Sequence, residues 1–338
     1  MDTKTENARN RWRLPAEWEP QEGVQLTWPH AKTDWAPMLN EIIGVYHEMA
    51  REIAERERLL VVAPEHAAHD CLRIVCSTND TWTRDHGFLS LIDDNGHRRL
   101  LDYRFNGWGE KFEARLDNAI NRLIFDLGEL QGEYVDCLDF VLEGGSIESD
   151  GKGTIFTTTG CLLAPHRNQP MTKADIEARL KKDLYAERVV WIDHGKLTGD
   201  DTDGHIDTLV RICPDDTLLY MGCDDLDDEQ YEELRLMEEQ LRALRTLNGK
   251  PYRLIKLPMP RAIFDGEDRL PATYANFLVI NGAVLCPTYA QPDLDGEALR
   301  LIGEAFPDRE IVGIDCRAVI KQHGSLHCCT MQYPKIQK

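Results

Sequence analysis

Hydrophobic positions along the chain alternate between the spacing of a helix and the spacing of a short strand. Apolar residues three or four positions apart predict five amphipathic helices. They cover residues 37–55, 110–125, 173–184, 228–244 and 296–306. The third begins with Thr172 and Asp175 placed as in a capping box, with Asp in place of the usual Glu or Gln.

A short apolar strand closely follows each predicted helix. These strands are RLLVVA from residue 58, EYVDCL from 133, RVVWI from 188, YRLIKL from 252 and EIVGID from 310. A polar segment comes next, and after most of these segments two strands flank a turn. The turns are Asn95-Gly96, Asp150-Gly151, Pro214–Asp216 and Asn281-Gly282, which are typical of hairpins. The pattern predicts a unit of helix, strand, polar turn and hairpin that occurs five times.

The two ends of the chain complement each other in this repeat. The last unit lacks its hairpin because the chain ends, whereas GVQLTW from residue 23 has strand character and no helix before it. We expect GVQLTW to pair with HCCTMQ from residue 327 and to close a ring. The prediction is a single α/β domain over residues 1–338, built as a five-bladed pseudo-symmetric α/β propeller. An ordinary three-layer α/β domain is the alternative.

Composition narrows the class of protein and its partners. The chain has 338 residues, 42% of them hydrophobic, which is enough for a sizeable core. A formal net charge of -20 argues against nucleic acid and favours small cationic substrates, although solubility alone would also explain it. The polar first residues and the lack of a long apolar run predict a cytoplasmic protein without a membrane span. The sequence leaves open whether the protein forms a homo-oligomer.

The cysteines favour reduced thiols over disulfides. The chain has 10 of them, mostly in apolar, strand-like runs and without a CxxC pair. The usual spacings of zinc ligands are also absent, so we expect neither a metal nor a cofactor.

Residues with chemical potential recur in the polar turns. The turns are NDTWTRD at 79–85, LEGGS at 142–146, GDDTDGHID at 199–207, TYAN at 273–276 and HGSLHCC at 323–329. In a closed ring these equivalent segments converge on the axis. They would bring together Asp85, Glu143, His205, Asp207 and either Cys328 or Cys329.

This set of side chains is suited to a guanidinium group. A thiolate is a nucleophile, and His205 can move protons near neutral pH. Several carboxylates around one pocket are costly unless they meet positive charge. A planar guanidinium supplies that charge and enough N–H donors for two carboxylates, while a third carboxylate could orient His205.

Longer segments carry a resemblance to a known family. LPAEWEPQEGVQLTWP (14–29), NDTWTRDHG (79–87), EGGSIESDGKGT (143–154), GDDTDGHIDT (199–208), YANF (274–277) and HGSLHCCTMQ (323–332) resemble the agmatine deiminases. They resemble the related bacterial peptidyl-arginine-deiminase-like proteins equally. These matches run in order through nearly the whole chain. The resemblance implies the five-bladed propeller of the guanidine-modifying enzymes and a hydrolysis without cofactor. Agmatine would be converted to N-carbamoylputrescine and ammonia through a covalent thiouronium intermediate.

The resemblance also implies a role for each matching residue. Cys328 corresponds to the nucleophile and His205 to the acid/base. Asp85 and Asp207 correspond to the pair that binds the guanidinium, and Glu143 to the carboxylate that holds the histidine. The resemblance further places Trp82 in the pocket lining and Asp201 near the substrate amine. We expect Cys329 to lie on the opposite face of a strand and His327 to be structural.

Two substitutions depart from the family pattern. Ser325 stands in place of an Asn and Met331 in place of a Gln. The loop between Pro258 and Thr273 is also shorter than in many members of that family. These differences bear on substrate length and closure. The alternatives are a deiminase of free arginine or peptidyl-arginine, an amidinotransferase, and a metal-binding or non-catalytic guanidine-binding module.

Overall fold

Five small sheets share one strand pattern in the computed structural model, which describes residues 11–64 and 72–336. In four of them an antiparallel hairpin is followed by a parallel third strand. They are β4-β5-β6, β7-β8-β9, β10-β11-β12 and β15-β16-β17. The fifth has the order β18-β1-β2-β3 and a small additional sheet pairs β13 with β14. The predicted strand repeat is therefore present in a mixed α/β fold, and each sheet is open.

The hairpins form at the predicted turns. Their strands are β4 (Leu89–Ile92) with β5 (Arg98–Arg104), β7 (Ile147–Ser149) with β8 (Thr154–Thr158), β10 (Val210–Cys213) with β11 (Thr217–Met221), and β15 (Leu278–Ile280) with β16 (Ala283–Thr288). The parallel partners are β6 (Glu133–Val141), β9 (Arg188–Ile192), β12 (Arg253–Leu257) and β17 (Glu310–Asp315). The two-stranded sheet comprises β13 (Phe264–Asp265) and β14 (Asp268–Arg269).

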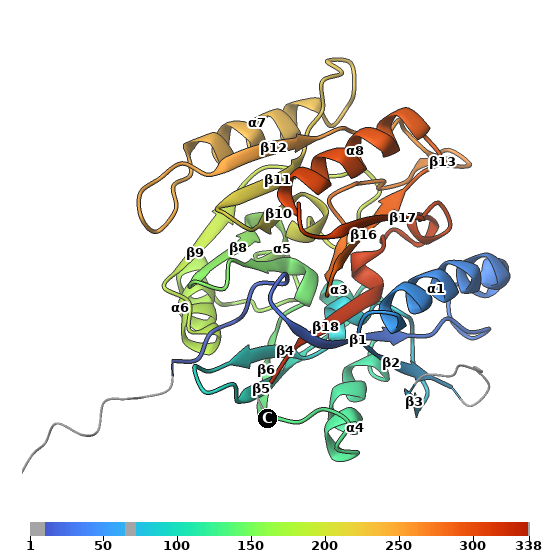
Figure 1. Cartoon of the computed structure of the whole chain (residues 1–338), viewed down its shortest axis with the longest axis vertical. Coiled ribbons are helices and arrows are strands. Elements are labelled where there is room, and N and C mark those ends of the chain that lie inside the picture. The colour runs from blue at the N-terminus through green and yellow to red at the C-terminus, as the bar shows by residue number, and fades with distance from the viewer. Residues whose placement is uncertain (1–10, 65–71, 337–338) are drawn as a thin grey trace, which may run out of the picture.

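The first and last strands of the chain pair as expected, but the last strand starts later than predicted, at Thr330. β1 (Gln21–Thr27) is antiparallel to β18 (Thr330–Pro334), with Leu26 opposite Thr330, and parallel to β2 (Arg58–Ala63). β3 (Leu72–Val75), which the sequence pattern did not predict, adds a parallel edge strand. The expected strand from residue 327 is wrong for its first three residues, because His327–Cys329 form the 3-10 turn η6. The N-terminal and C-terminal segments thus share one sheet (Figure 1).

Four of the five predicted helices match the structure closely. They are α1 (Leu39–Ala54), preceded by the 3-10 turn η1 (Ala36–Met38), α6 (Lys173–Leu184), α7 (Tyr231–Ala243) and α8 (Pro292–Ala305). α8 begins four residues before the predicted start, because Pro292 suits the first helical turn. The helices lie outside the small sheets in Figure 1.

The predicted helix over residues 110–125 is wrong in its first half. α4 covers only Ile120–Asp126, after the 3-10 turn η2 (Asp117–Ala119) and the short α3 (Gly107–Glu110). Inside α3, Trp108 and Gly109 have φ values of 56° and 85°, which redirect the chain. The backbone N–H of Leu116 donates to the Asn79 side chain at 2.7 Å, a tertiary contact that replaces a helical hydrogen bond. The apolar residues in the first half of this segment therefore belong to a loop that packs beside the polar turn of residues 79–85, and not to a helix.

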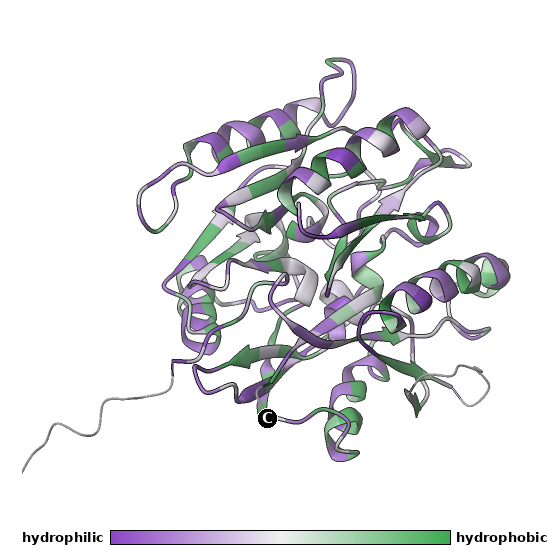
Figure 2. Cartoon of the chain, viewed as in Figure 1, coloured by the Kyte–Doolittle hydropathy of each residue, from purple (hydrophilic) through white to green (hydrophobic). Residues whose placement is uncertain are grey.

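Two clusters of buried hydrophobic residues form the interior. The larger one includes Trp35, Ile42 and Tyr46 with strands and helices of the C-terminal half, and the smaller one includes Phe88, Phe140 and Ile155. Figure 2 shows hydrophobic residues along many of the strands and hydrophilic residues on the outer helices. Within the described residues, no helix has both the length and the apolar character that a membrane crossing requires.

The predicted capping box of α6 is present. The Thr172 side chain accepts from the backbone N–H of Asp175, and the Asp175 carboxylate accepts from the backbone N–H of Thr172. We expect Thr172→Ala to lower the free energy of unfolding by about 1 kcal/mol, because the backbone N–H of Asp175 at the helix N-terminus loses its side-chain partner. Thr172→Ser, which keeps the hydroxyl, should remain within about 0.5 kcal/mol of the parent. Urea unfolding followed by circular dichroism measures both, and equal losses in the two variants would contradict the capping role.

Candidate active site

An acidic pocket of about 190 Å³ opens onto Cys328. Its lining has four aspartates, three aromatic side chains and no Lys or Arg among the described residues. The aspartates are Asp34, Asp80, Asp85 and Asp201, and the aromatics are Trp82, Trp108 and Phe112. Thr202, Gln322, His323 and Gly324 complete it. A pocket of this charge favours a cationic ligand.

The 3-10 turn η6 directs its two cysteines to different surroundings. Cys328 lines the pocket, and its thiol and backbone N–H lie 3.4 and 3.3 Å from Oδ1 of Asn276. The Cys329 thiol is fully buried and donates to the Ser325 carbonyl oxygen at 3.5 Å. Consecutive side chains in a 3-10 turn lie about 120° apart. The separation of the two thiols therefore comes from this turn, and the expectation of opposite strand faces is wrong.

Two carboxylates lie close enough to the Cys328 thiol to influence it electrostatically. Asp85, on the short helix α2 (Thr83–His86), accepts from Nε1 of Trp108 at 2.9 Å and from the Gly145 backbone N–H at 3.0 Å. Asp207, on the 3-10 turn η4 (Ile206–Thr208), has Oδ2 at 4.0 Å from Sγ of Cys328, and its Oδ1 has no hydrogen-bond partner. The carboxylates therefore have fixed positions and retain free acceptor capacity.

Gly145 is required by the close approach of these groups. A Cβ at this position would lie 2.6 Å from Nδ1 of His205 and 2.9 Å from Oδ1 of Asp85. Both distances are shorter than van der Waals contact, so any larger residue would push His205 and Asp85 apart. The second glycine of LEGGS thus has a packing reason that the sequence pattern alone did not supply.

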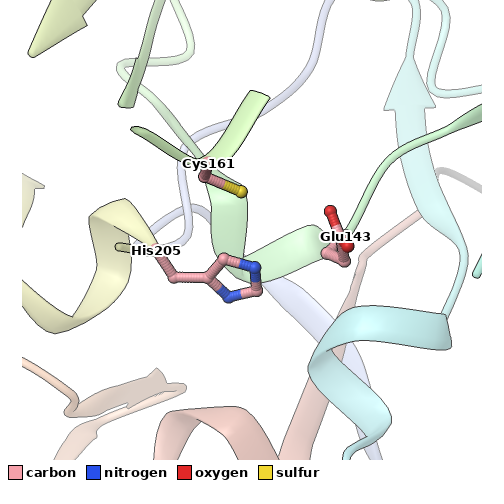
Figure 3. A group of neighbouring side chains, drawn as sticks. All are labelled: Glu143, Cys161 and His205. Atoms are coloured by element: carbon pink, nitrogen blue, oxygen red, sulfur yellow. The ribbon is translucent and has the colours of Figure 1, made fainter. Parts of the chain in front are cut away.

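His205 lies behind Asp85, next to Glu143 and Cys161 (Figure 3). Its Nδ1 is 3.6 Å from Oδ1 of Asp85, and neither ring nitrogen has a hydrogen-bond partner. Glu143 pairs through Oε1 with Nε of Arg167 at 3.0 Å, which leaves Oε2 unpaired. The imidazole thus has two carboxylates nearby and free nitrogens with which to exchange protons.

Burial and negative charge shift the pKa values of Cys328 and His205. Burial raises the pKa of the Cys328 thiol well above its usual value, and the charges of Asp207 and Asp85 raise it further. Burial lowers the pKa of His205, but Asp85, followed by Cys161 and Glu143, outweighs that effect, so the net pKa lies well above its usual value. Without a ligand, the site therefore favours a neutral thiol and a charged imidazolium.

A second buried layer of charges supports Asp207. Nδ1 of His327 is 2.7 Å from Oδ2 of Asp207, and its Nε2 is 2.8 Å from Glu17. Arg211 contacts the same Glu17 at 2.9 Å and Glu148 at 2.6 Å. Burial raises the pKa of Asp207, but the His327 hydrogen bond and charge lower it below its usual value. This layer keeps Asp207 ionised and oriented.

Known proteins share this chain's sequence and architecture over nearly its full length. The profile of the Porphyromonas-type peptidyl-arginine deiminase family matches residues 13–334. The chain belongs to this family. A Porphyromonas gingivalis structure provisionally named an arginine deiminase is 48% identical, with a TM-score of 0.91 over 96% of this chain and 100% of that one.

Two further relatives carry the name agmatine deiminase. The Stutzerimonas stutzeri protein is 33% identical over 99% of both chains. The structure of the C. jejuni enzyme, a cysteine-to-serine variant with substrate bound, is 35% identical with a TM-score of 0.91, over 99% of this chain and 100% of that one. The relatives of this chain are therefore named for different guanidine substrates.

In this member of the family, the residues predicted from the sequence lie in one region. Asp85, Trp82, Asp201 and Cys328 line the pocket. His205, Glu143 and Asp207 are fully buried behind it, linked through the Asp85 and Cys328 contacts described above. His327 contacts Asp207 and Glu17, so it supports the site from within rather than facing the pocket.

Sequence reasoning missed residues that the structure adds to the site. Asn276 holds the Cys328 backbone and thiol, and Trp108 donates to Asp85. Asp80 accepts from Nε1 of Trp82 at 3.2 Å and lines the pocket with Asp34. Asn276 and Asp80 lie inside the polar turns that the repeat singled out. Their position in these turns could have identified Asn276 and Asp80 as site residues. Trp108 lies outside the turns, just before the helix predicted over residues 110–125, so the repeat offered no sign of its role.

Removing Arg211 should destabilise the buried layer of charges. We expect Arg211→Met to lower the free energy of unfolding by about 3–5 kcal/mol, because Glu17 and Glu148 lose their buried partner. Arg235→Met is the matched control, since Arg235 pairs with Glu232 on the exposed face of α7 and should cost at most about 1 kcal/mol. Urea unfolding measures both variants. Equal, small losses would show that Arg211 does not hold the layer together.

Proposed function

We propose that the protein is an agmatine deiminase that hydrolyses the guanidinium of agmatine to a ureido group and ammonia. The observation that carries the proposal is one pocket lined by the Cys328 thiol, Asp85 and further aspartates, with no described Lys or Arg in the lining and with the buried Asp207 4.0 Å from Sγ of Cys328. Relatives named agmatine deiminase at 33% and 35% identity support it.

The guanidinium enters with its plane toward Sγ of Cys328. Asp85 and Asp207 accept N–H donors from its edges, since each carboxylate retains acceptor capacity. The cation offsets the negative charge that raises the pKa of Cys328. The thiol proton then leaves to water in the pocket, and the resulting thiolate is produced where the substrate is bound.

Attack by the Cys328 thiolate on the guanidinium carbon forms a C–S bond. His205, whose raised pKa keeps it protonated, donates a proton to one amino nitrogen. The C–N bond breaks and ammonia leaves, so a thiouronium remains on Cys328. Neutral His205 then takes a proton from water as the water oxygen attacks the same carbon. The tetrahedral species expels the thiolate and passes its hydroxyl proton to that sulfur, which yields the neutral ureido product and the free thiol, while Glu143 and Asp85 hold the imidazole.

The far wall of the pocket favours agmatine over arginine. Asp34, Asp80 and Asp201 offer negative charge to a terminal ammonium and repel an α-carboxylate. Lys111 near this wall is already bound to Asp203 at 2.8 Å and to the Asp201 carbonyl oxygen at 2.6 Å. Nδ1 of His323 lies 2.8 Å from the Gly199 carbonyl oxygen. The aromatic side chains offer apolar contact to the methylene chain between the two charges.

The proposal extends to the architecture and the compartment. We propose that the five sheets are blades of one pseudo-symmetric propeller domain over residues 1–338, because equivalent turns from the units meet at one site. The 9 described cysteines are free, which supports a reducing compartment such as the cytoplasm. Cys71 lies outside the described residues.

A substrate panel tests the activity. The protein is incubated with agmatine, free arginine and an arginine peptide, and ammonia and ureido product are measured. We expect kcat/KM for agmatine to exceed that for arginine at least roughly a hundredfold, because the aspartates of the far wall attract the terminal ammonium of agmatine and repel the α-carboxylate of arginine. Preference for arginine or the peptide would transfer the assignment to that substrate. Transfer of the amidino group to an added amine would identify a transferase, and no turnover of any guanidine would reject the deiminase proposal.

Substitution of each cysteine tests the nucleophile. Cys328→Ser should lower kcat by at least about 10⁴-fold, because a hydroxyl is a far weaker nucleophile at neutral pH. Cys329→Ser is the matched control and should keep kcat within about threefold, since its thiol packs against Ser325 and lies outside the pocket lining. Ammonia release measures both, and the reverse pattern would assign the nucleophile to Cys329.

Asp80 should set an acidic limb in the pH profile. Burial and the charge of Asp34 raise the pKa of Asp80 to about 6. Below that pH Asp80 is protonated and attracts an ammonium less, so kcat/KM for agmatine should fall as the pH drops through about 6. Asp80→Asn should raise KM about tenfold, equivalent to about 1.4 kcal/mol, and remove this limb.

Asp117 offers a contrasting case for the same experiment. Its carboxylate accepts from the backbone N–H groups of Asn79 and Asp80, and burial raises its pKa to about 7. An acidic limb that persists in Asp80→Asn would assign the ionisation to Asp117 and contradict the role of Asp80. The profile is measured as kcat/KM between about pH 5 and about pH 9. These limits lie at least about one pH unit beyond the raised pKa values of Asp80 and Asp117.

A further inference from the structure

Three buried side chains beside the pocket form a set that the proposed reaction does not fully use. Glu143, Cys161 and His205 each offer one ligand atom, and these atoms lie within 4.8 Å of one another. Glu143 follows β6, Cys161 lies on the short helix α5 (Thr159–Leu162), and His205 precedes η4. Figure 3 shows the three side chains around a common space. Among the described residues, no other cysteine belongs to such a group.

Several polar atoms in this set have no hydrogen-bond partner. They are both ring nitrogens of His205 and Oε2 of Glu143, in residues that are fully buried. Buried polar groups are nearly always paired, so unpaired atoms that converge on one space indicate a missing ligand. Arg167 binds the other Glu143 oxygen, which fixes the carboxylate and leaves Oε2 free for that ligand.

We propose that Glu143, Cys161 and His205 bind Zn²⁺ as an inhibitory ion. Tetrahedral zinc bonds of about 2.0–2.3 Å place ligand atoms roughly 3.5 Å apart, so small rotations bring these three into position. A thiolate with an imidazole selects zinc over Mg²⁺ or Ca²⁺, which prefer oxygen ligands. On binding, Cys161 loses its thiol proton and His205 binds as neutral imidazole, so protons are released to solvent.

The ion reaches this site through the substrate pocket. Asp85 lines the pocket and is 3.6 Å from Nδ1 of His205, so the two sites are adjacent. The acidic lining attracts divalent cations as it attracts a guanidinium. Zinc and substrate therefore compete for entry, and zinc-bound His205 can neither donate nor accept the protons of the reaction.

Cobalt binding tests the site independently of any activity. Co²⁺ replaces zinc and gives a thiolate-to-cobalt absorption band in the near ultraviolet. The parent for this experiment is Cys328→Ser, which removes the pocket thiol. We expect the band in this variant and in Cys328→Ser/Cys329→Ser, but loss of it in Cys328→Ser/Cys161→Ser. A band that persists without Cys161, or no band in the parent, would overturn the proposal.

Zinc inhibition tests the consequence and rests on the proposed function. Agmatine turnover should be inhibited competitively by Zn²⁺ and recovered with EDTA. Cys161→Ser, with Cys161→Ala as a second variant, should keep turnover and raise the inhibition constant at least roughly tenfold, because one of three protein ligands is lost. Inhibition unchanged in both variants would overturn the proposed site. If no guanidine is turned over, the cobalt experiment still decides the metal site, so the two proposals fail separately.

Discussion

The buried guanidinium of Arg211 connects the segments on which the site depends. It binds Glu17 from the N-terminal segment, Glu148 from β7 and the carbonyl oxygens of Ala275 and Phe277. It also lies 3.2 Å from Nε2 of His327, the residue before Cys328 in the chain. A buried cation with this many acceptors fixes the relative positions of elements far apart in the sequence, because each acceptor would otherwise lose its partner. Asp207 takes its position from His327, one contact away from Arg211.

The site itself carries an excess of buried negative charge. Asp85, Glu143 and Asp207 are fully or almost fully buried near Cys328, and Asp34, Asp80 and Asp201 continue the charge along the pocket. Burying carboxylates is costly without a cation. In the proposed reaction, a cationic substrate supplies the missing charge, and the same event lowers the barrier to forming the Cys328 thiolate. Selectivity and activation then have one electrostatic cause.

In the proposed reaction, the unpaired nitrogens of His205 leave the imidazole free to exchange protons. An imidazole that must donate and then accept protons cannot have both nitrogens held by permanent partners. The same unpaired atoms, with Cys161 and Glu143 beside them, make the position open to a thiophilic metal. The structure therefore links the proposed proton transfer and the proposed zinc site through one side chain.

The sequence by itself determined the local elements and the residue types of the site. Periodicity, the Thr172 capping box and Asn281-Gly282 predict helices and hairpins because they depend on neighbouring residues alone. Equivalent polar turns indicated Asp85, Glu143, His205, Asp207 and the cysteine pair. The helix expected over residues 110–125 failed because Asn79 takes the Leu116 backbone N–H, a contact that no local pattern records. Only the tertiary structure brought Asn276, Trp108 and Asp80 to the pocket and showed that a 3-10 turn, not a strand, directs Cys328 and Cys329 apart. Those outcomes depend on burial and distances between distant segments, which the fold alone sets.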